Sequence, residues 1–178
     1  MVLMKKCMVR FLRIGIVSSL LFAGSAVAVF AAPVAPSFSA VALEGKPVAS
    51  NELAGKAYIV NFFASWCPPC RAEIPDMVAL QTKYARKGFT FIGVAVNETE
   101  PTMRAFIKKN KINYPVVMVD DKLMGSFNPL VDGGVRAIPT SFVINASGNV
   151  TQVITGGRSK AVLEKIILES LGKSATSK

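Results

Sequence analysis

The stretch that decides the fold is Asn61-Phe62-Phe63-Ala64-Ser65-Trp66-Cys67-Pro68-Pro69-Cys70-Arg71-Ala72-Glu73. It completes a β-rich, apolar run over residues 58–63, which predicts a strand buried on both faces of a parallel or mixed sheet. Apolar residues then recur at helical spacing over about 69–86, and Pro75 is expected to kink that helix. The two cysteines therefore lie where a buried strand meets a helix.

The cysteine pair limits the chemistry of the chain. Apart from Cys7, Cys67 and Cys70 are its only cysteines, and it contains no histidine. Catalysis by Ser-His-Asp or Cys-His groups is thus excluded, and a zinc site would lack two of its four ligands. A purely structural bridge closing a loop of about four residues would stabilise the fold by only about 2 kcal/mol. The spacing favours a redox pair, in which one thiolate attacks a partner disulfide and the second resolves the mixed disulfide.

The two cysteines are expected to have different roles. Cys67, in the first turn of the helix, would face unpaired N–H groups and the positive end of the helix dipole, which stabilise a thiolate. We therefore expect Cys67 to be the nucleophile, and the better buried Cys70 to keep a higher pKa and act second. Pro68 and Pro69 lack N–H groups that would hold the thiolate. Their absence should make the pair more reducing.

The remaining elements predict an α/β fold of order β-α-β-α-β, followed by a strand pair and a last helix. Residues 39–43 and 47–49 suggest an N-terminal hairpin, with Ser50 capping a short helical turn. Strands are expected over 89–96, 116–119, 140–144 and 150–154, the last two antiparallel. Thr99 should cap a helix through residue 110, and Ser159 a final helix. The apolar stripe of that final helix comprises Val162, Leu163, Ile166, Ile167 and Leu171.

The N-terminus is a separate segment of different composition. Four basic residues precede residue 14, no charged residue follows until Glu44, and residues 14–32 are almost wholly apolar. With Ala26-Val27-Ala28 as an A-x-A-like cleavage pattern, residues 1–28 predict a signal peptide or an uncleaved membrane anchor. Residues 29–37 are expected to form an extended linker. Either interpretation exports the rest of the chain, which would touch a membrane only through an uncleaved leader.

The charge of the chain gives little indication of nucleic-acid binding. The formal net charge is +10, and the four cations of the leader reduce it to +6 for the body. Those cations are scattered, and only Lys108, Lys109 and Lys111 form a run, which fits the solvated face of a helix. A nucleic-acid surface usually shows denser basic charge, so no nucleic-acid partner is expected.

These residues give the body a clear resemblance to the TlpA/ResA-like thiol-disulfide oxidoreductases. The resemblance is carried by residues 61–75, 94–97 and 138–145. It implies a thioredoxin-like, three-layer domain over 38–172, with a central mixed sheet flanked by helices, and a tail over 173–178. Pro139 would be a cis-proline that faces the cysteines, keeps the backbone open for a substrate strand and excludes metals; the alternative is a proline that merely begins a strand. Trp66, Pro68, Pro69, Ile138 and Pro139 are expected to contact the substrate.

The resemblance also gives Glu73 and Asn61 a significance of their own. Ordinary thioredoxins carry a buried aspartate where this chain has Asn61, which cannot accept a proton in that way. Glu73 matches an active-site carboxylate of the TlpA/ResA-like branch, where it would raise cysteine pKa values and relay a proton to Cys70. The alternative is an exposed glutamate that complements the helix dipole.

The expected function is an exported, periplasmic reductase of disulfides in envelope proteins, soluble after cleavage or anchored by residues 14–32. An oxidised client and a membrane-embedded thiol electron donor would be its partners, and no metal or cofactor beyond the Cys67–Cys70 disulfide is expected. The cytochrome c branch carries Gly-Ala-Pro-Glu where this chain has Ala137-Ile138-Pro139-Thr140, which weakens that assignment without excluding it. Two alternatives remain: an oxidase or isomerase of the same fold, and a binding module whose disulfide stays closed.

Overall fold

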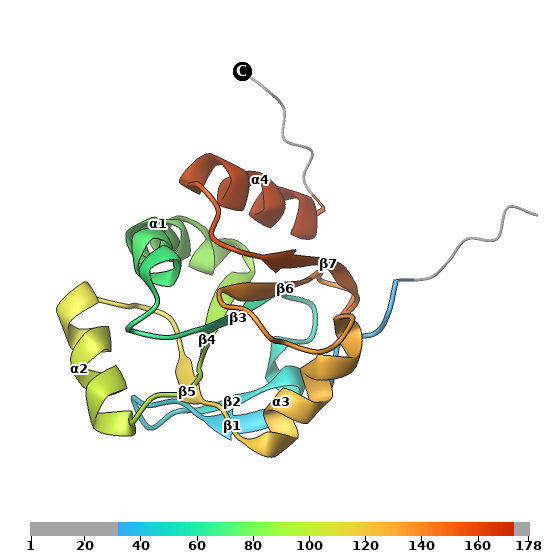
Figure 1. Cartoon of the computed structure of the whole chain (residues 1–178). Helices are drawn as coiled ribbons and strands as arrows, with labels where there is room; N and C mark the ends of the chain where they lie inside the picture. Colours follow the sequence, from blue (N-terminus) through green and yellow to red (C-terminus); the bar gives the residue numbers. More distant parts are fainter. Residues whose placement is uncertain (1–31, 173–178) are drawn as a thin grey trace, which may run out of the picture. The chain divides into compact units, whose positions relative to one another are not determined.

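A five-stranded mixed sheet forms the centre of the computed structural model, which describes residues 32–172 (Figure 1). The strands are β3 (Ala57–Phe63), β4 (Phe89–Ala95), β5 (Val116–Met118), β6 (Thr140–Ile144) and β7 (Val150–Thr155), in the order β5-β4-β3-β6-β7. β3, β4 and β5 are parallel, whereas β6 pairs antiparallel with both β3 and β7. The predicted mixed sheet with a buried central strand is confirmed.

Helices and a hairpin cover the two faces of this sheet. The helices are α1 (Pro68–Tyr84), α2 (Glu100–Asn110), α3 (Asp121–Phe127) and α4 (Lys160–Ser170). The hairpin consists of β1 (Ser39–Val41) and β2 (Pro47–Ala49), and short 3-10 turns span Ser50–Leu53, Ala85–Lys87 and Asn128–Leu130. The three-layer α/β fold with an N-terminal hairpin is therefore as predicted.

The core consists of two layers separated by the sheet. Successive residues of β3 alternate between the layers, because side chains of a strand point to opposite faces. Ile59 and Phe63 join the layer beneath α1, α2 and α4, whereas Val60 and Phe62 join the layer beneath α3 and the hairpin. Every residue of β3 is buried, which fixes the position of its C-terminal end and of the cysteines that follow.

Helix α3 is the element that the sequence analysis missed. It begins after Asp120, whose Oδ1 accepts a hydrogen bond from the Leu123 N–H at 2.6 Å. Leu123 and Phe127 bury one side of it. A helix of this length gives too few apolar repeats for a periodicity argument, so only the cap was available as a signal.

Four details of the predicted helices are wrong. Ser50 lies within the 3-10 turn, and its hydroxyl contacts the backbone of Phe38 instead of capping. Thr99 and Ser159 occupy the expected N-cap positions, but neither side chain makes a capping hydrogen bond. The Thr99 hydroxyl instead bonds that of Thr102 at 2.8 Å. Val162 is exposed, so the buried stripe of α4 is narrower than its apolar sequence suggested.

The described N-terminal residues pair with the turn between β6 and β7. The Ala35 N–H donates to the Gly148 carbonyl at 2.9 Å, and the Val150 N–H donates to the Pro33 carbonyl at 2.8 Å. The predicted leader over 1–28 and the tail over 173–178 lie outside the described residues. Between residues 32 and 172, no helix has the length and apolar character needed to cross a membrane.

Candidate active site

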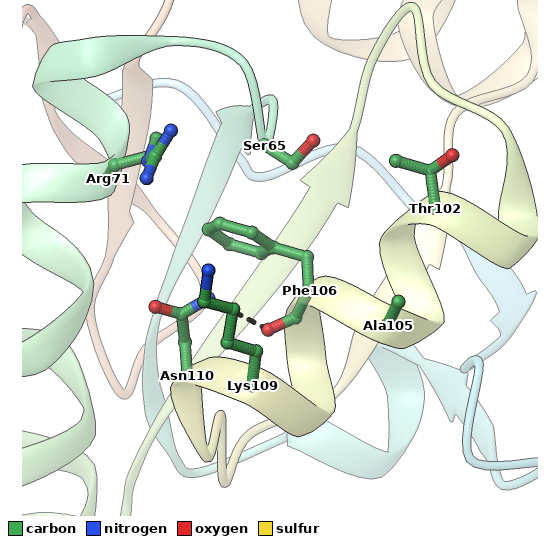
Figure 2. A pocket seen from close by; sticks show the side chains of 7 residues that line it. All are labelled: Ser65, Arg71, Thr102, Ala105, Phe106, Lys109 and Asn110. Atoms are coloured by element: carbon green, nitrogen blue, oxygen red, sulfur yellow. Dashed lines mark hydrogen bonds between the residues drawn. The ribbon is translucent and has the colours of Figure 1, made fainter.

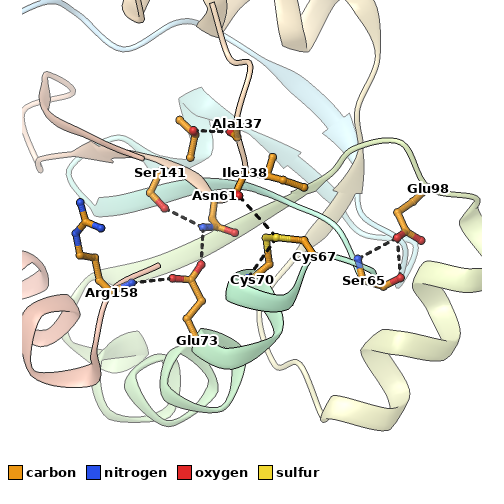
Figure 3. Close-up of a disulfide and its surroundings, with 11 residues drawn as sticks. Asn61, Ser65, Cys67, Cys70, Glu73, Glu98, Ala137, Ile138, Ser141 and Arg158 are labelled. Carbon is orange, nitrogen blue, oxygen red and sulfur yellow. Dashed lines mark hydrogen bonds between the residues drawn. A yellow bond between two sulfur atoms is a disulfide. The ribbon is translucent and has the colours of Figure 1, made fainter. Parts of the chain in front are cut away.

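The cysteine pair lies at the start of α1, a few residues after the C-terminal end of β3 (Figure 3). Cys67 and Cys70 form a disulfide, with their Cα atoms 5.3 Å apart. Cys67 is the N-cap residue of α1, and its Sγ accepts a hydrogen bond from the Cys70 N–H at 3.4 Å. Pro68 and Pro69 occupy the next two positions, so this bond is the only contribution of the first turn to the sulfur. The Cys70 N–H is thus the one first-turn donor that faces Cys67 as the sequence predicts.

Both cysteines are buried, and the segment before β6 lies against Cys67. Cys67 is 3% exposed and Cys70 is 1% exposed, so Cys70 is better buried, as predicted, but only slightly. The Sγ of Cys67 lies 3.7 Å from the Ile138 carbonyl oxygen. The Ile138–Pro139 peptide bond is cis, as the resemblance implied, and Pro139 is buried. Ile138 thus places a backbone acceptor against the sulfur that is expected to react first.

The loop in front of the cysteines is held by the segment that follows β4. Glu98 accepts hydrogen bonds from both the N–H and the hydroxyl of Ser65, at 2.9 and 2.6 Å. The Trp66 indole N–H donates to the Asn97 carbonyl at 3.2 Å, while the residue stays 56% exposed. Trp66 therefore offers an apolar surface beside the disulfide. Glu98 was not predicted, because nothing local in the sequence links it to a residue 33 positions earlier.

Glu73 is buried beside the disulfide and is not the exposed helix residue of the alternative hypothesis. It is 6% exposed, with Oε1 accepting from Asn61 Nδ2 at 3.2 Å and Oε2 accepting from the Arg158 N–H at 3.3 Å. Burial raises the pKa of Glu73 to about 7, an effect that these hydrogen bonds and the charge of Arg158 only partly oppose. The carboxyl group can therefore take up or release a proton near neutral pH.

Asn61 links Glu73 to the sheet. It faces Ser141 in the pairing of β3 with β6, and its Nδ2 donates to the Ser141 hydroxyl at 2.8 Å as well as to Glu73. Its Oδ1 is buried and has no hydrogen-bond partner within residues 32–172. The same environment raises the pKa of Tyr114, through burial and the negative charge of Glu73. The sequence did not predict that Asn61 links Glu73 to Ser141, nor that the Arg158 N–H donates to Glu73.

The structure brings together all the residues that sequence analysis had proposed for the site. Trp66, Cys67, Pro68, Pro69, Cys70 and Glu73 belong to one loop and the first turns of α1, and Ile138 and Pro139 approach from the segment before β6. Within residues 32–172, no group of three or more histidine, cysteine, aspartate or glutamate side chains is placed to hold a metal ion. The arrangement can support thiol chemistry with a buried proton carrier.

Comparison with known proteins gives relatives over nearly the whole described region. The family model described as Redoxin matches residues 31–167. A thiol-disulfide oxidoreductase ResA of Bacillus cereus is 36% identical over 131 residues, which cover 73% of this chain and 72% of the relative. ResA of Bacillus subtilis (strain 168) is 31% identical over 130 residues, or 72% of this chain and 69% of the relative.

Solved structures agree with these sequence relatives. A thiol:disulfide interchange protein of the thioredoxin family from Chlorobium tepidum TLS is 55% identical, with a TM-score of 0.79, over 80% of this chain and 99% of its own. A putative thiol:disulfide interchange protein DsbE from Chlorobium tepidum is 32% identical, with a TM-score of 0.67, over 79% of this chain and 97% of its own.

Proposed function

The chain belongs to the Redoxin family, as a TlpA/ResA-like thiol-disulfide oxidoreductase, and on that premise we propose that it acts outside the cytoplasm as a reductase of protein disulfides. The observation that carries the reducing direction is the first turn of α1. Only the Cys70 N–H reaches the Cys67 sulfur, because Pro68 and Pro69 have none to offer. A thiolate with few donors is poorly stabilised, which favours the oxidised form of the enzyme and makes its dithiol a reductant.

In the reductive half-reaction, the Cys67 thiolate attacks one sulfur of a client disulfide. The client's other sulfur leaves as a thiolate and takes a proton, which gives a mixed disulfide between Cys67 and the client. Cys70 then loses its proton and attacks the Cys67 sulfur, so that the client leaves with both of its sulfurs reduced. The Cys67–Cys70 disulfide of the structure is the product, and two electrons have passed to the client.

Glu73 is the proposed proton carrier for the second step. Its carboxylate form can accept the Cys70 proton and its carboxylic acid form can return one, since its pKa of about 7 populates both forms near neutral pH. Asn61 and the Arg158 N–H hold the two carboxylate oxygens in place. Glu73 thus supports the resolving step without bonding to substrate.

The proposed partners follow from this cycle. An oxidised protein of the cell envelope would receive the electrons, with Trp66, Ile138 and Pro139 contacting it beside the disulfide. A membrane-embedded thiol donor would reduce Cys67–Cys70 again, and no bound cofactor or metal is needed. The leader over residues 1–28 would place the enzyme in the periplasm, either released after cleavage or anchored through residues 14–32.

The direction of electron flow is tested by the reduction potential of Cys67–Cys70. The full chain carrying Cys7→Ser, so that only this pair titrates, is equilibrated in glutathione or dithiothreitol buffers. We expect a value near that of thioredoxin, about −270 mV. A value near about −120 mV would identify an oxidase, and a bridge that no buffer reduces would identify a permanent disulfide.

The order of attack is tested with single-cysteine variants in the same background. Cys70→Ser should accumulate a mixed disulfide with an oxidised client, because Cys67 can attack but nothing resolves the product. The matched Cys67→Ser variant should accumulate far less. Equal trapping by both variants would contradict the assignment of Cys67 as nucleophile.

A further inference from the structure

A pocket of about 300 Å³ lies between α2 and the segment around the start of α1 (Figure 2). It is lined by Ser65, Arg71, Thr102, Ala105, Phe106, Lys109 and Asn110. Ser65 is two residues before Cys67, and Arg71 follows Cys70 directly. Since adjacent Cα atoms are about 3.8 Å apart, the Cα atom of each of these two lining residues is within about 8 Å of the Cα atom of a reactive cysteine.

The charge of this pocket is entirely positive. Arg71 and Lys109 are its only charged lining residues, both are exposed, and neither forms an ion pair with any described residue. The carboxylate of Glu98, whose Oε1 accepts both hydrogen bonds from Ser65, does not line the pocket. Two cations that line one hollow, with no acidic residue in its lining and no ion pair of their own, favour the binding of an anion.

The remaining lining restricts the size and shape of that anion. Phe106 and Ala105 provide an apolar wall, and the Asn110 side-chain amide donates one hydrogen bond to the Phe106 carbonyl at 2.9 Å. The volume is at the lower end of the range for small-molecule sites, about 300–1,000 Å³. One side chain with a short apolar stem and a charged end fits these features better than a large cofactor.

We propose that this pocket binds an aspartate or glutamate side chain of the client protein whose disulfide reacts at Cys67–Cys70. The proposal rests on the function proposed above, because it requires a protein disulfide as substrate. An acidic residue near the client cysteine would meet Arg71 and Lys109 while Trp66 and Ile138 contact the peptide at the disulfide itself. The pocket therefore selects clients by charge and orients them for attack.

The sequence offers a control on the same helix. Lys108 and Lys109 are neighbours in the last turn of α2 and affect the helix dipole alike. Only Lys109 lines this pocket, whereas Lys108 lines a separate hollow with Leu43, Glu44 and Arg104. Lys108→Gln and Lys109→Gln remove the same charge from the chain, but only the second removes it from the proposed site.

The test is the rate at which the reduced full chain reduces synthetic peptides, each with one internal disulfide. The peptides differ in a single position, Glu or Gln, moved from four residues before to four residues after the first cysteine. For each enzyme the Glu-to-Gln rate ratio is taken, which cancels any change in the intrinsic reactivity of the dithiol. We expect a ratio of about five- to tenfold at one or two positions at low salt. It should approach one at about 0.5 M salt.

The variants then locate the effect. Lys109→Gln should lower the ratio clearly and Arg71→Gln/Lys109→Gln should bring it near one, while Lys108→Gln, which removes the same charge as Lys109→Gln, should keep most of it. A wild-type ratio near one at every position would overturn the proposal, as would an equal loss in Lys108→Gln, which would show a diffuse charge effect of α2. If no peptide of either kind is reduced while small disulfides also fail to react, the proposed function itself is wrong.

Discussion

At the scale of single residues, the site depends on a carboxyl group held away from water. Glu73 keeps two hydrogen bonds, to Asn61 and to the backbone of Arg158, yet burial outweighs them in setting its pKa. Near pH 7 the Glu73 carboxyl group is fully ionised in the unfolded chain but only about half ionised in the folded one. Ionising it in the folded chain costs free energy, so the fold becomes less stable as the group loses its proton. Function and stability therefore oppose each other at this position.

Replacing Glu73 should change how the stability of the protein depends on pH. Its pKa rises from 4.5 to about 7 on folding, so the folded chain binds a proton that the unfolded chain releases between these values. The free energy of unfolding should fall by about 3 kcal/mol as pH rises through this window, and Glu73→Gln should remove that fall. Urea unfolding of the oxidised protein at about pH 4.5 and about pH 8, on either side of the window, measures it.

A control and a second readout complete this prediction. Glu44→Gln, at an exposed position in the hairpin turn, should leave the fall in stability unchanged. Glu73→Gln should also flatten the pH dependence of thiol exchange near pH 7, because no carboxyl group titrates at the site. An identical pH slope of stability in wild type and Glu73→Gln would contradict the assigned burial of the charge.

At the scale of elements, the first turn of α1 sets the chemistry of the cysteines. An N-cap side chain accepts from the N–H groups of the second and third helical positions. Here the third is Cys70, whose N–H reaches the Cys67 sulfur, and the second is Pro69, which has no N–H. One donor is thus missing where a helix would normally provide it.

Pro69→Ala should restore that donor. A hydrogen bond to a charged group contributes about 1.5–3 kcal/mol, so the reduction potential should rise by about 30–60 mV and the pKa of Cys67 should fall. Pro68→Ala adds an N–H at the first helical position, which does not cap, and should shift the potential much less. Equilibration with glutathione measures both. Equal shifts in the two variants would show that the effect is not one of helix capping.

Two glycines test the packing inside a strand and a helix of the fold. A Cβ at Gly93 in β4 would lie 2.8 Å from Cε1 of Phe63 and 3.2 Å from Cγ2 of Val116, whereas a Cβ at Gly125 in α3 would meet nothing within 4 Å. Gly93→Ala should therefore destabilise the fold by about 1–3 kcal/mol through overpacking. Gly125→Ala should stabilise it by about 0.5–1 kcal/mol through helix propensity. Denaturant unfolding gives both values, and a shared sign would contradict the prediction.

At the scale of the whole molecule, the sequence predicts what is local and misses what depends on register. The buried strand β3, the cysteines after it and the strand pair β6–β7 each follow from patterns within a few residues. The contact of Asn61 with Ser141 joins residues 80 positions apart and exists only in one pairing of β3 with β6. Arg158 serves Glu73 through its backbone N–H, which no side-chain pattern can indicate.

The start of the domain gives the last prediction. Residues 33–35 join the β6–β7 turn through two backbone hydrogen bonds, while Val34 is exposed and the half-buried Ala35 packs against the core. A fragment beginning at Phe38 should unfold with about 1–3 kcal/mol less free energy than one beginning at Pro33. The β6–β7 turn follows the C-terminal end of β6, whereas Ile138, which lies against Cys67, precedes its N-terminal end. Both fragments should therefore have the same Cys67–Cys70 reduction potential. A potential that changes with the truncation would mean that the N-terminal residues influence the site through β6; equal stabilities would mean that these bonds contribute nothing.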